Sequence, residues 1–297
     1  MTKLNKRMQR AQFVSNVESI FQCPHCGSSM QVMELASLVC SNQHSFDFTK
    51  QGYVNLTSQA VKTKYSRELF EARRKIIDSD RFFVPLTETL AEGINRYAPA
   101  KKENIFILDA GCGEGSLFSR ICDFVLSRFH RYVTGVGMDL SKEGVREASK
   151  QHSGKVWTVA DLAAAPFQND QFDVIFNILS PSNYAEFNRL LKMDGILIKV
   201  VPQQQYLKEL RKSFFHESEN NPYSNAETVD HFKNNFHVIN HTNIHYKINL
   251  NHASLQNLIK MTPLTWDIPD KHVRSYLNKV STQDITVDLD VFIGKKK

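Results

Sequence analysis

The stretch Ile107-Leu-Asp-Ala-Gly-Cys-Gly-Glu-Gly-Ser116 decides the fold, because it places three glycines between a strand-like run and a helix-like run. The apolar residues before it, starting at Ile105, are typical of a buried strand. Glycine lets the backbone turn sharply and approach a ligand closely, because it has no Cβ atom. The stretch therefore predicts a strand, a tight turn that faces a ligand, and a helix.

Strand-like and helix-like segments alternate downstream of this turn. Five apolar runs have strand length: Ile105–Asp109, Tyr132–Asp139, Val156–Ala160, Phe172–Phe176 and Gly195–Val201. Such alternation is typical of a mostly parallel sheet with helices on both faces. We expect an α/β, Rossmann-like fold, with helices over residues 65–99 and 203–215, strands at Phe236–His241 and Ile285–Phe292, and a solvated Gly-Lys-Lys-Lys tail.

Three of these strands end on acidic residues, Asp109, Asp139 and Asp161, the last followed by Leu162. Ligands of open α/β sheets bind at the carboxyl ends of the strands, so these carboxylates should converge on one crevice. In Rossmann-like methyltransferases an acid at the position of Asp109 faces the methionine amino group of S-adenosylmethionine. The position of Asp139 suits hydrogen bonds to both ribose hydroxyls, and that of Asp161 suits the adenine amino group.

The turn contains Gly111, Gly113 and Glu114, and these residues indicate which nucleotide-like ligand the crevice binds. A dinucleotide fingerprint needs Gly-x-Gly-x-x-Gly with the diphosphate at the helix N-terminus, where Glu114 would repel it. An acid there favours a ligand with a cationic part, such as the sulfonium nucleoside. A phosphate-binding P-loop is excluded, because no Gly-Lys-Ser/Thr follows. We therefore expect S-adenosylmethionine rather than NAD.

A second motif, Cys23-x2-Cys26-x13-Cys40-x3-His44, predicts a structural zinc site. Two tight turns would each deliver two ligands to a tetrahedral Zn²⁺, and with four protein ligands the site is closed. The metal would hold together a segment that has few large apolar residues. The alternative is a chance group of free thiols. We expect His25 not to be a ligand, and the remaining cysteines, Cys112 and Cys122, to be small buried apolar residues.

Composition and charge say less about the class of protein than the motifs do. The 297 residues are 41% hydrophobic and 23% charged, which is ordinary for a globular protein. No apolar run approaches the roughly 20 residues that span a bilayer, and the basic first 20 residues lack the apolar core of a signal peptide. We expect a cytoplasmic protein without membrane contact. The net charge of +6 is compatible with a polyanionic partner and supports one only weakly.

These motifs together resemble the RlmA family of bacterial 23S rRNA (guanine-N1)-methyltransferases over nearly the whole chain from about residue 21. The resemblance rests on the order of the zinc ligands, the phrase from His44 to Leu56 (which contains Gly-Tyr-Val-Asn-Leu), the glycine loop, Ala72-Arg73-Arg74, and Met261-Thr-Pro263 with Trp266. The chain departs from the family at Met193-Asp-Gly195, where Pro-Gly-Gly is usual, and at Asn177-Ile-Leu-Ser-Pro181, where Tyr-Ala-Pro or Phe-Ala-Pro is usual.

The resemblance implies methylation of N1 of a guanine in a hairpin loop of 23S rRNA, with the zinc module helping to recognise the RNA. It carries cofactor contacts over to Gly113 and Glu114, and to Phe83 and Tyr206, where the family usually shows Tyr and His. Family members can be dimers, so a homodimer is expected. We divide the chain into a basic lead-in with the zinc-binding module, residues 1–60, and a methyltransferase domain, residues 61–297.

Several interpretations stay open on the sequence alone. The substrate could be a small molecule or another RNA, or the chain could be a non-catalytic RNA-binding protein. Asp78, Glu68 and Asp161 are conceivable general bases, and no motif selects one. The basic lead-in reads as a solubilising tail in preference to an added RNA contact. Basic residues between the two motifs are candidate RNA contacts or an ordinary solvated helix face: Lys62, Lys64, Arg67, Arg73 and Arg74.

Overall fold

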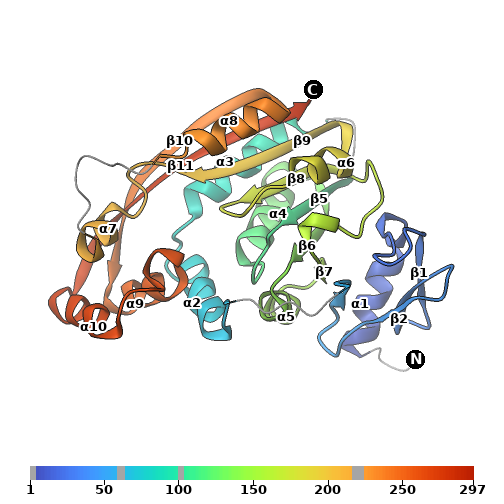
Figure 1. Ribbon diagram of the computed structural model, residues 1–297, viewed down its shortest axis with the longest axis horizontal. Coiled ribbons are helices and arrows are strands. Elements are labelled where there is room, and N and C mark those ends of the chain that lie inside the picture. The colour runs from blue at the N-terminus through green and yellow to red at the C-terminus, as the bar shows by residue number, and fades with distance from the viewer. Residues whose placement is uncertain (1–4, 59–63, 100–103, 216–223) are drawn as a thin grey trace.

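The structure, a computed structural model, describes residues 5–58, 64–99, 104–215 and 224–297. Eight strands form one sheet in the order β10-β11-β9-β8-β5-β6-β7-β4 (Figure 1). Their bounds are β4 (Val54–Asn55), β5 (Asn104–Ala110), β6 (Tyr132–Asp139), β7 (Val156–Val159), β8 (Phe172–Ile178), β9 (Leu191–Pro202), β10 (Phe236–Asn251) and β11 (Thr282–Lys296).

The pairing of the strands confirms the predicted mostly parallel sheet. All neighbours from β4 to β9 pair in parallel, whereas β11 runs antiparallel to both β9 and β10. β5 lies at the centre, with β6 on one side and β8 on the other. The chain leaves β5 for β6 on one side and returns from β7 to β8 on the other, so a crevice opens above the carboxyl end of β5. This is the α/β class I methyltransferase fold that the sequence predicts.

Helices cover both faces of the sheet, each over its own layer of buried apolar side chains. On one face lie α3 (Val84–Tyr97), α4 (Ser116–Phe129) and α5 (Lys142–Gln151), and on the other lie α6 (Tyr184–Leu190) and α8 (Ala226–Asn235) (Figure 1). Alternation along β5 divides its side chains between the layers: Ile107 joins the first and Leu108 the second.

The other helices gather at one end of the long β10–β11 ribbon (Figure 1). They are α2 (Arg67–Asp78), α7 (Lys208–Phe214), α9 (His252–Met261) and α10 (Asp270–Lys279), and α2 packs against α9. The helix predicted over residues 65–99 is thus two helices. They separate where Arg81 has a φ of +57° and where the Ser254 hydroxyl donates to Asp80 at 2.6 Å.

Two further predictions about element length need correction. The helix expected at 203–215 begins only at Lys208, because Leu207 has a φ of +53° and its N–H donates to Thr286 of β11. The C-terminal Gly-Lys-Lys-Lys is not a free tail, because β11 continues to Lys296, which pairs with Phe236. The expected short strands are instead a long hairpin-like ribbon whose pairing runs over the whole length of β10.

The N-terminal module occupies the opposite end of the molecule (Figure 1). It holds α1 (Lys6–Ser15) and a separate antiparallel sheet of β1 (Met30–Met33), β2 (Ser37–Cys40) and β3 (Ser45–Asp47). The chain then reaches the edge of the main sheet, where β4 pairs in parallel with β7. The N–H of Gln22 also donates to the carbonyl of Pro166 at 3.0 Å, so the module contacts the core beyond the β4–β7 pairing.

The basic lead-in is not a solubilising tail over its described part, so that prediction is wrong. It forms α1, which buries Ala11 and Val14. The Arg10 guanidinium donates to the carbonyls of Ser149 at 3.4 Å and His152 at 3.1 Å, at the end of α5. Arg10 also packs over Gly52, where a Cβ atom would lie 2.2 Å from its Cγ. α1 therefore packs between the zinc module and the core.

None of the helices within the described ranges is long and apolar enough to cross a bilayer.

Candidate functional site

The four predicted metal ligands come together at the end of the small sheet. Cys23 and Cys26 lie on a turn closed by Gly27, whose N–H donates to the Cys23 carbonyl at 2.9 Å and whose φ is +73°. Cys40 and His44 lie on a second turn, in which the Cys40 N–H donates to the His44 carbonyl at 3.1 Å. The ligand atoms of all four residues lie within 4.8 Å of one another.

The distances between these atoms fit a tetrahedral zinc ion. Zn–S bonds of about 2.3 Å and Zn–N bonds of about 2.0–2.1 Å place neighbouring ligand atoms about 3.8 Å apart for two sulfurs and about 3.6 Å apart for sulfur and nitrogen. The two Sγ atoms of Cys26 and Cys40 are 3.6 Å apart. His44 Nδ1 lies 3.5 Å from Cys23 Sγ and 3.4 Å from Cys40 Sγ. The residues thus form a closed Cys3His zinc site.

The other histidine and cysteines lie where the sequence predicts. His25 stacks on Phe46, with ring centroids 5.5 Å apart, and is not among the clustered ligands. Cys112 and Cys122 are buried in the core of the large domain. The metal set is therefore confined to the four spaced residues.

The glycine loop between β5 and α4 needs glycine for two reasons. Gly111, Gly113 and Gly115 have φ values of +94°, +57° and +77°, a region that L side chains rarely adopt. A Cβ atom on Gly111 would also lie 2.8 Å from the Cβ of Ser180, at the end of the neighbouring β8. The loop can therefore turn sharply while the tip of β8 approaches it closely.

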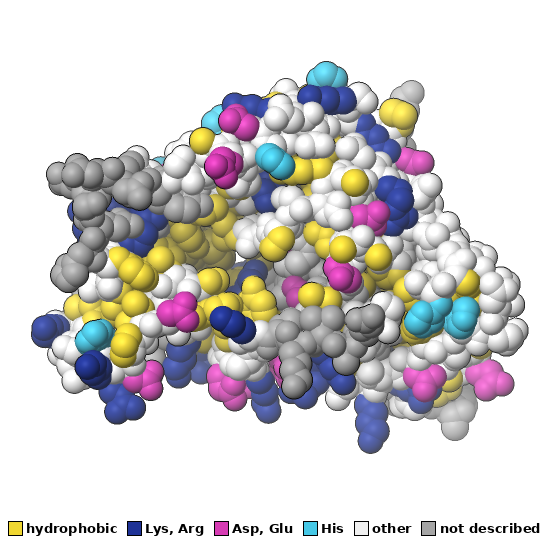
Figure 2. All heavy atoms as spheres, viewed as in Figure 1, with side chains coloured by type: hydrophobic (Ala, Val, Ile, Leu, Met, Phe, Trp, Pro, Cys, Tyr) yellow, Lys and Arg dark blue, Asp and Glu magenta, His cyan; other side chains and the backbone are white. Residues whose placement is uncertain are grey.

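A cleft of two adjoining cavities opens at the carboxyl ends of the strands. The cofactor cavity, as we call the first, has a volume of about 290 Å³ and is lined by five of the predicted residues: Gly111, Gly113, Asp139, Asp161 and Leu162. The acceptor cavity, the second, has a volume of about 410 Å³ and is lined by the predicted Phe83 and Tyr206. Both cavities share Tyr65, Arg73, Ile178, Leu179, Ser180 and Pro181. Figure 2 shows a hollow lined by hydrophobic side chains on this face.

The carboxylate of Asp139 is held in place by the backbone. One oxygen accepts from the Gly113 N–H at 2.8 Å and the other from the Ser141 N–H at 2.7 Å. Burial raises the pKa of Asp139, and these two N–H bonds oppose that shift. Since a carboxylate has about four acceptor positions, two positions remain for a ligand. Asp161 differs, because it is exposed and one of its oxygens caps a short turn by accepting from the Ala163 N–H at 2.8 Å.

Asp109 and Glu114 are buried behind the glycine loop and do not line either cavity among the described residues. Burial raises the pKa of Asp109 to about 7, although the Arg73 guanidinium opposes the shift. Glu114 Oε2 lies 3.1 Å from Arg73 Nε in an ion pair, whereas Glu114 Oε1 is buried without a hydrogen-bond donor in the described part of the chain. The site thus holds an unsatisfied carboxylate oxygen beside the loop.

The structure places Arg73 in this cleft and not on the ordinary solvated helix face that was the alternative to an RNA contact. It lines both cavities and its ion pair with Glu114 fixes it beside Gly113. Lys64 and Arg67 are exposed, as an RNA-facing surface requires, and Arg67 pairs with Glu71 at 2.8 Å. Arg74 is half-buried on the same helix, and Lys62 lies outside the described residues.

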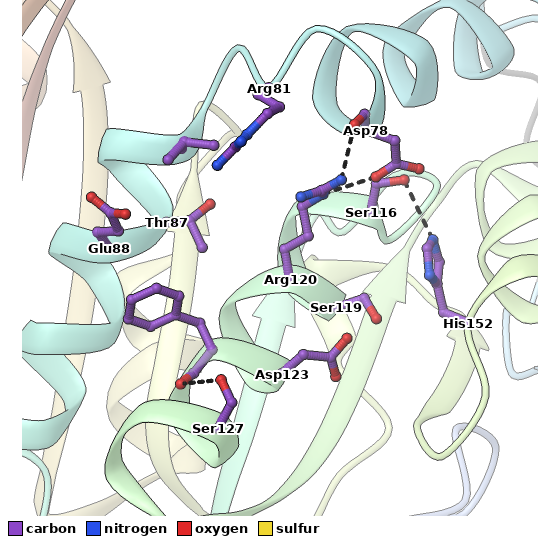
Figure 3. Close-up of a pocket in the computed structure, with 12 residues that line it drawn as sticks. Asp78, Arg81, Thr87, Glu88, Ser116, Ser119, Arg120, Asp123, Ser127 and His152 are labelled. Atoms are coloured by element: carbon purple, nitrogen blue, oxygen red, sulfur yellow. Dashed lines mark hydrogen bonds and ion pairs between the residues drawn. The ribbon is translucent and has the colours of Figure 1, made fainter.

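A third cavity, of about 560 Å³, lies away from the cleft between α3 and α4 (Figure 3). Asp78 faces it and accepts from Arg120 at 2.9 Å, and Ser116 Oγ lies 3.4 Å from His152 Nε2. None of its described lining residues belongs to a strand of the sheet. Asp78 is therefore remote from the strand tips, and Glu68 lies on an exposed hollow beside Lys260. Of the three conceivable bases only Asp161 lines the cleft.

Sequence reasoning did not select several residues that the structure places in the cleft. Tyr65 lines both cavities and stands edge-on to Trp266, with ring centroids 5.3 Å apart. Lys199 lines the acceptor cavity and Ser180 lines both. The signal for Lys199 was present, because it is one lysine inside the apolar run of a buried strand. Ser180 lies in the segment Asn177–Pro181 that departs from the family pattern, whereas Tyr65 carries no signal in the sequence.

Comparison with known proteins agrees with this geometry. Residues 21–67 match a family model described as RlmA, N-terminal, and residues 107–195 match one described as a methyltransferase domain. YxjB of Bacillus subtilis, which carries the name of a 23S rRNA (guanine-N1)-methyltransferase, is 45% identical over 94% of this chain and 98% of its own. A 23S rRNA (guanine(748)-N1)-methyltransferase of Streptomyces fradiae is 28% identical over 92% of this chain and 96% of its own.

Proposed function

Since this chain belongs to the RlmA family of methyltransferases, we propose that it transfers a methyl group from S-adenosylmethionine to N1 of a guanine in a hairpin loop of 23S rRNA. The observation that carries the proposal is the 45% identity to YxjB, which carries the name of such an enzyme, over nearly the whole of both chains. The matched length includes the zinc module and the cleft. A methyltransferase that acts on a small molecule would have no evident use for the zinc module. A non-catalytic RNA-binding protein would have no evident use for a complete cofactor cleft.

The cleft fits the methyl donor, and we propose how its residues hold it. Asp139 accepts from the ribose hydroxyls through its two free acceptor positions, and Asp161 with Leu162 bounds the adenine. Gly111 and Gly113 allow the methionine part to approach the backbone. Asp109 and Glu114, buried behind the loop, favour its ammonium group by their negative charge without lining the cavity. Phe83 and Tyr206 line the wall toward the acceptor. When bound, the sulfonium supplies an already activated methyl group, so the protein mainly has to position the acceptor.

The acceptor atom dictates how the RNA must enter. N1 lies on the Watson–Crick edge of guanine, so it is hidden in a duplex and accessible only in an unpaired or flipped base. Figure 2 shows Lys and Arg side chains along the lower edge of this face, with Asp and Glu side chains among them. Arg67 and Lys75 of α2 are exposed. We propose that this edge and the zinc module contact the RNA backbone, which would make binding strongly dependent on salt.

Three further properties follow from the same proposal. The division into residues 1–60 and 61–297 is kept, with β4 as the strand that joins the zinc module to the main sheet. The enzyme acts in the cytoplasm, because that is where bacterial 23S rRNA is made. The protein is a homodimer, which light scattering on the purified protein would test by giving twice the chain mass of 34.1 kDa.

The experiment that tests the function is deletion of the gene followed by primer extension across 23S rRNA. A methyl group on N1 blocks base pairing, so reverse transcriptase stops at the modified guanine. We expect one stop to vanish in the deletion strain and to return with a plasmid copy of the wild type, while an Asp139→Ala copy should fail to restore it. An unchanged pattern of stops in the deletion strain would refute the proposed function.

A further inference from the structure

Lys199 of β9 is a buried lysine whose ammonium group lies at the tip of the neighbouring strand β8. Only 3% of the residue is exposed. Its Nζ donates to Asn177 Oδ1 at 2.5 Å, to Ser182 Oγ at 2.9 Å and to the carbonyl of Ser180 at 3.0 Å. Asn177 lies near the end of β8, and Ser180 and Ser182 follow that strand, so all three acceptors lie around the carboxyl end of β8.

The partners of Lys199 are all neutral, which is unusual for a buried cation. It makes no ion pair with any residue in the described part of the chain, and burial lowers its pKa to about 8. A buried charge without an opposite charge is strongly unfavourable, and buried lysines are normally paired. By contrast Lys192, at the other end of the same strand, pairs with Asp173 at 3.0 Å. The site around Lys199 is thus arranged to receive negative charge.

The position of Lys199 links the two halves of the cleft. Ser180, to whose carbonyl it donates, donates from its own hydroxyl to the carbonyl of Ala110 at 2.9 Å, at the start of the glycine loop. Lys199 itself lines the acceptor cavity, which adjoins the cofactor cavity at Ser180 and Pro181. A base that enters the acceptor cavity to meet the methyl donor therefore passes close to this ammonium group.

The acceptor cavity contains no group that could serve as an ordinary carboxylate base. Among its described lining residues none is an Asp, Glu or His. The titratable and charged groups around Lys199 are, in that cavity, Tyr65, Arg73 and Tyr206, and, in the hollow on its α8 side, Tyr184, Glu227, Asp230 and His231. Positive charge would make removal of the N1 proton easier, since no carboxylate among the described lining residues of this cavity is placed to take it.

We propose that the Lys199 ammonium group recognises O6 of the target guanine and stabilises the negative charge that O6 acquires when N1 loses its proton. This inference rests on the proposed function and names a residue for it. N1 gives its proton to water, and the electron pair left on N1 forms the bond to the methyl carbon. The carbon–sulfur bond breaks at the same time and its electrons remain on sulfur, so the products are neutral N1-methylguanine and a thioether.

The same contact explains the choice of base. Guanine presents an acceptor at O6, whereas adenine presents an amino donor at the equivalent position and has no proton on N1. An ammonium group attracts the first and repels the second. Lys199 thereby acts on both recognition and rate, through interactions that strengthen as charge develops on O6.

The test compares Lys199→Met and Lys199→Arg with Lys192→Met in single-turnover methylation of an RNA hairpin between pH 6 and 9. Lys192 is a matched control: it lies on the same strand, about 23 Å away by strand rise, so its loss perturbs folding without touching the cleft. We expect Lys199→Met to be slowed about 100-fold near pH 7, the usual effect of removing one preorganised donor. The deficit should shrink as pH rises, because hydroxide then removes the N1 proton unaided and because Lys199 of the wild type loses its own charge above about pH 8.

Lys199→Arg, which keeps the charge, should retain most of the rate, and Lys192→Met should match the wild type. A merely structural role for Lys199 predicts a deficit that does not vary with pH, or a parallel loss of S-adenosylhomocysteine binding, and either result would overturn the proposal. A wild type that methylates no hairpin and no full-length 23S rRNA refutes the proposed function itself, whereas normal wild-type methylation with a pH-independent deficit in Lys199→Met refutes only the role of Lys199.

A measurement on the wild type keeps the inference testable if Lys199→Met does not fold. The acid limb of its single-turnover rate should give an apparent pKa at least one unit below the N1 pKa of the free hairpin, because the ammonium group stabilises the deprotonated base. Coincidence of the two values would contradict the proposal.

Discussion

Replacing Asp139 by Asn tests the geometry of the cofactor cavity with almost no change in shape. In the native protein the two carboxylate oxygens accept from the N–H groups of Gly113 and Ser141 at 2.8 Å and 2.7 Å. Asn offers one oxygen and an NH2 group, so one of these buried N–H groups would face a donor. An unsatisfied buried donor destabilises a protein by about 1–3 kcal/mol, and that loss should appear as a lower midpoint in urea unfolding.

The same substitution should weaken cofactor binding by a predictable amount. The two acceptor positions that Asp139 leaves free become at most one, and the negative charge is lost. A hydrogen bond to a charged acceptor contributes about 1.5–3 kcal/mol, which corresponds to a factor of roughly 10 to 150 in the dissociation constant. Calorimetric titration with S-adenosylhomocysteine measures this factor directly, without any dependence on RNA binding or methyl transfer.

The matched control is Asp123→Asn, since Asp123 of α4 lies outside the cleft. Its side chain is 73% exposed and lies 3.4 Å from Lys155, a surface pair that contributes about 0–1 kcal/mol at most. Its affinity for S-adenosylhomocysteine should equal that of the wild type. If Asp139→Asn loses stability yet binds the ligand as tightly as the wild type, Asp139 does not hold the ribose and the assignment of the cavity is wrong.

Three further predictions follow. Affinity for S-adenosylhomocysteine should fall by up to tenfold per pH unit below about 7, because the raised pKa of Asp109 leaves it protonated there and removes a negative charge from behind the glycine loop, which favours the ligand's ammonium group. Asp109→Asn should abolish this dependence in the same titration, and a flat wild-type profile would contradict it. Removal of zinc by a chelator, or Cys26→Ser, should abolish RNA methylation but leave that affinity intact, and equal loss of both would show that the zinc module holds the cleft together. Gly52→Ala should lower the free energy of unfolding by about 2–5 kcal/mol, because alanine is strained at the left-handed φ of this position and its Cβ would displace Arg10. An unchanged urea midpoint would count against the packing of α1 between the zinc module and the core.

The sequence was informative wherever the determinant is local. The zinc ligands follow from spacing, because two short turns bring Cys23, Cys26, Cys40 and His44 together without help from the rest of the chain. The strand tips follow from alternation, because parallel strands present their carboxyl ends at one edge. Asp139 and Asp161 therefore reach the cofactor cavity as the sequence predicts.

The failures all depend on contacts between distant segments. Arg73 looks like a surface residue of a basic helix, and only its ion pair with Glu114, about forty positions away, places it in the cleft. α1 looks like a charged tail, and only Gly52 and the end of α5 show why Arg10 is buried. From the sequence Lys199 is one more residue of a strand, and only its acceptors at the carboxyl end of β8 show where its ammonium group lies.

The most direct test of the central claim uses purified protein, S-adenosylmethionine with a deuterated methyl group, and 23S rRNA from the deletion strain. Mass spectrometry of the digested nucleosides then identifies the product. We predict one deuterated N1-methylguanosine per rRNA molecule and no other labelled nucleoside. Label on another base or another position of guanine, or none with protein that binds S-adenosylhomocysteine, would contradict the account.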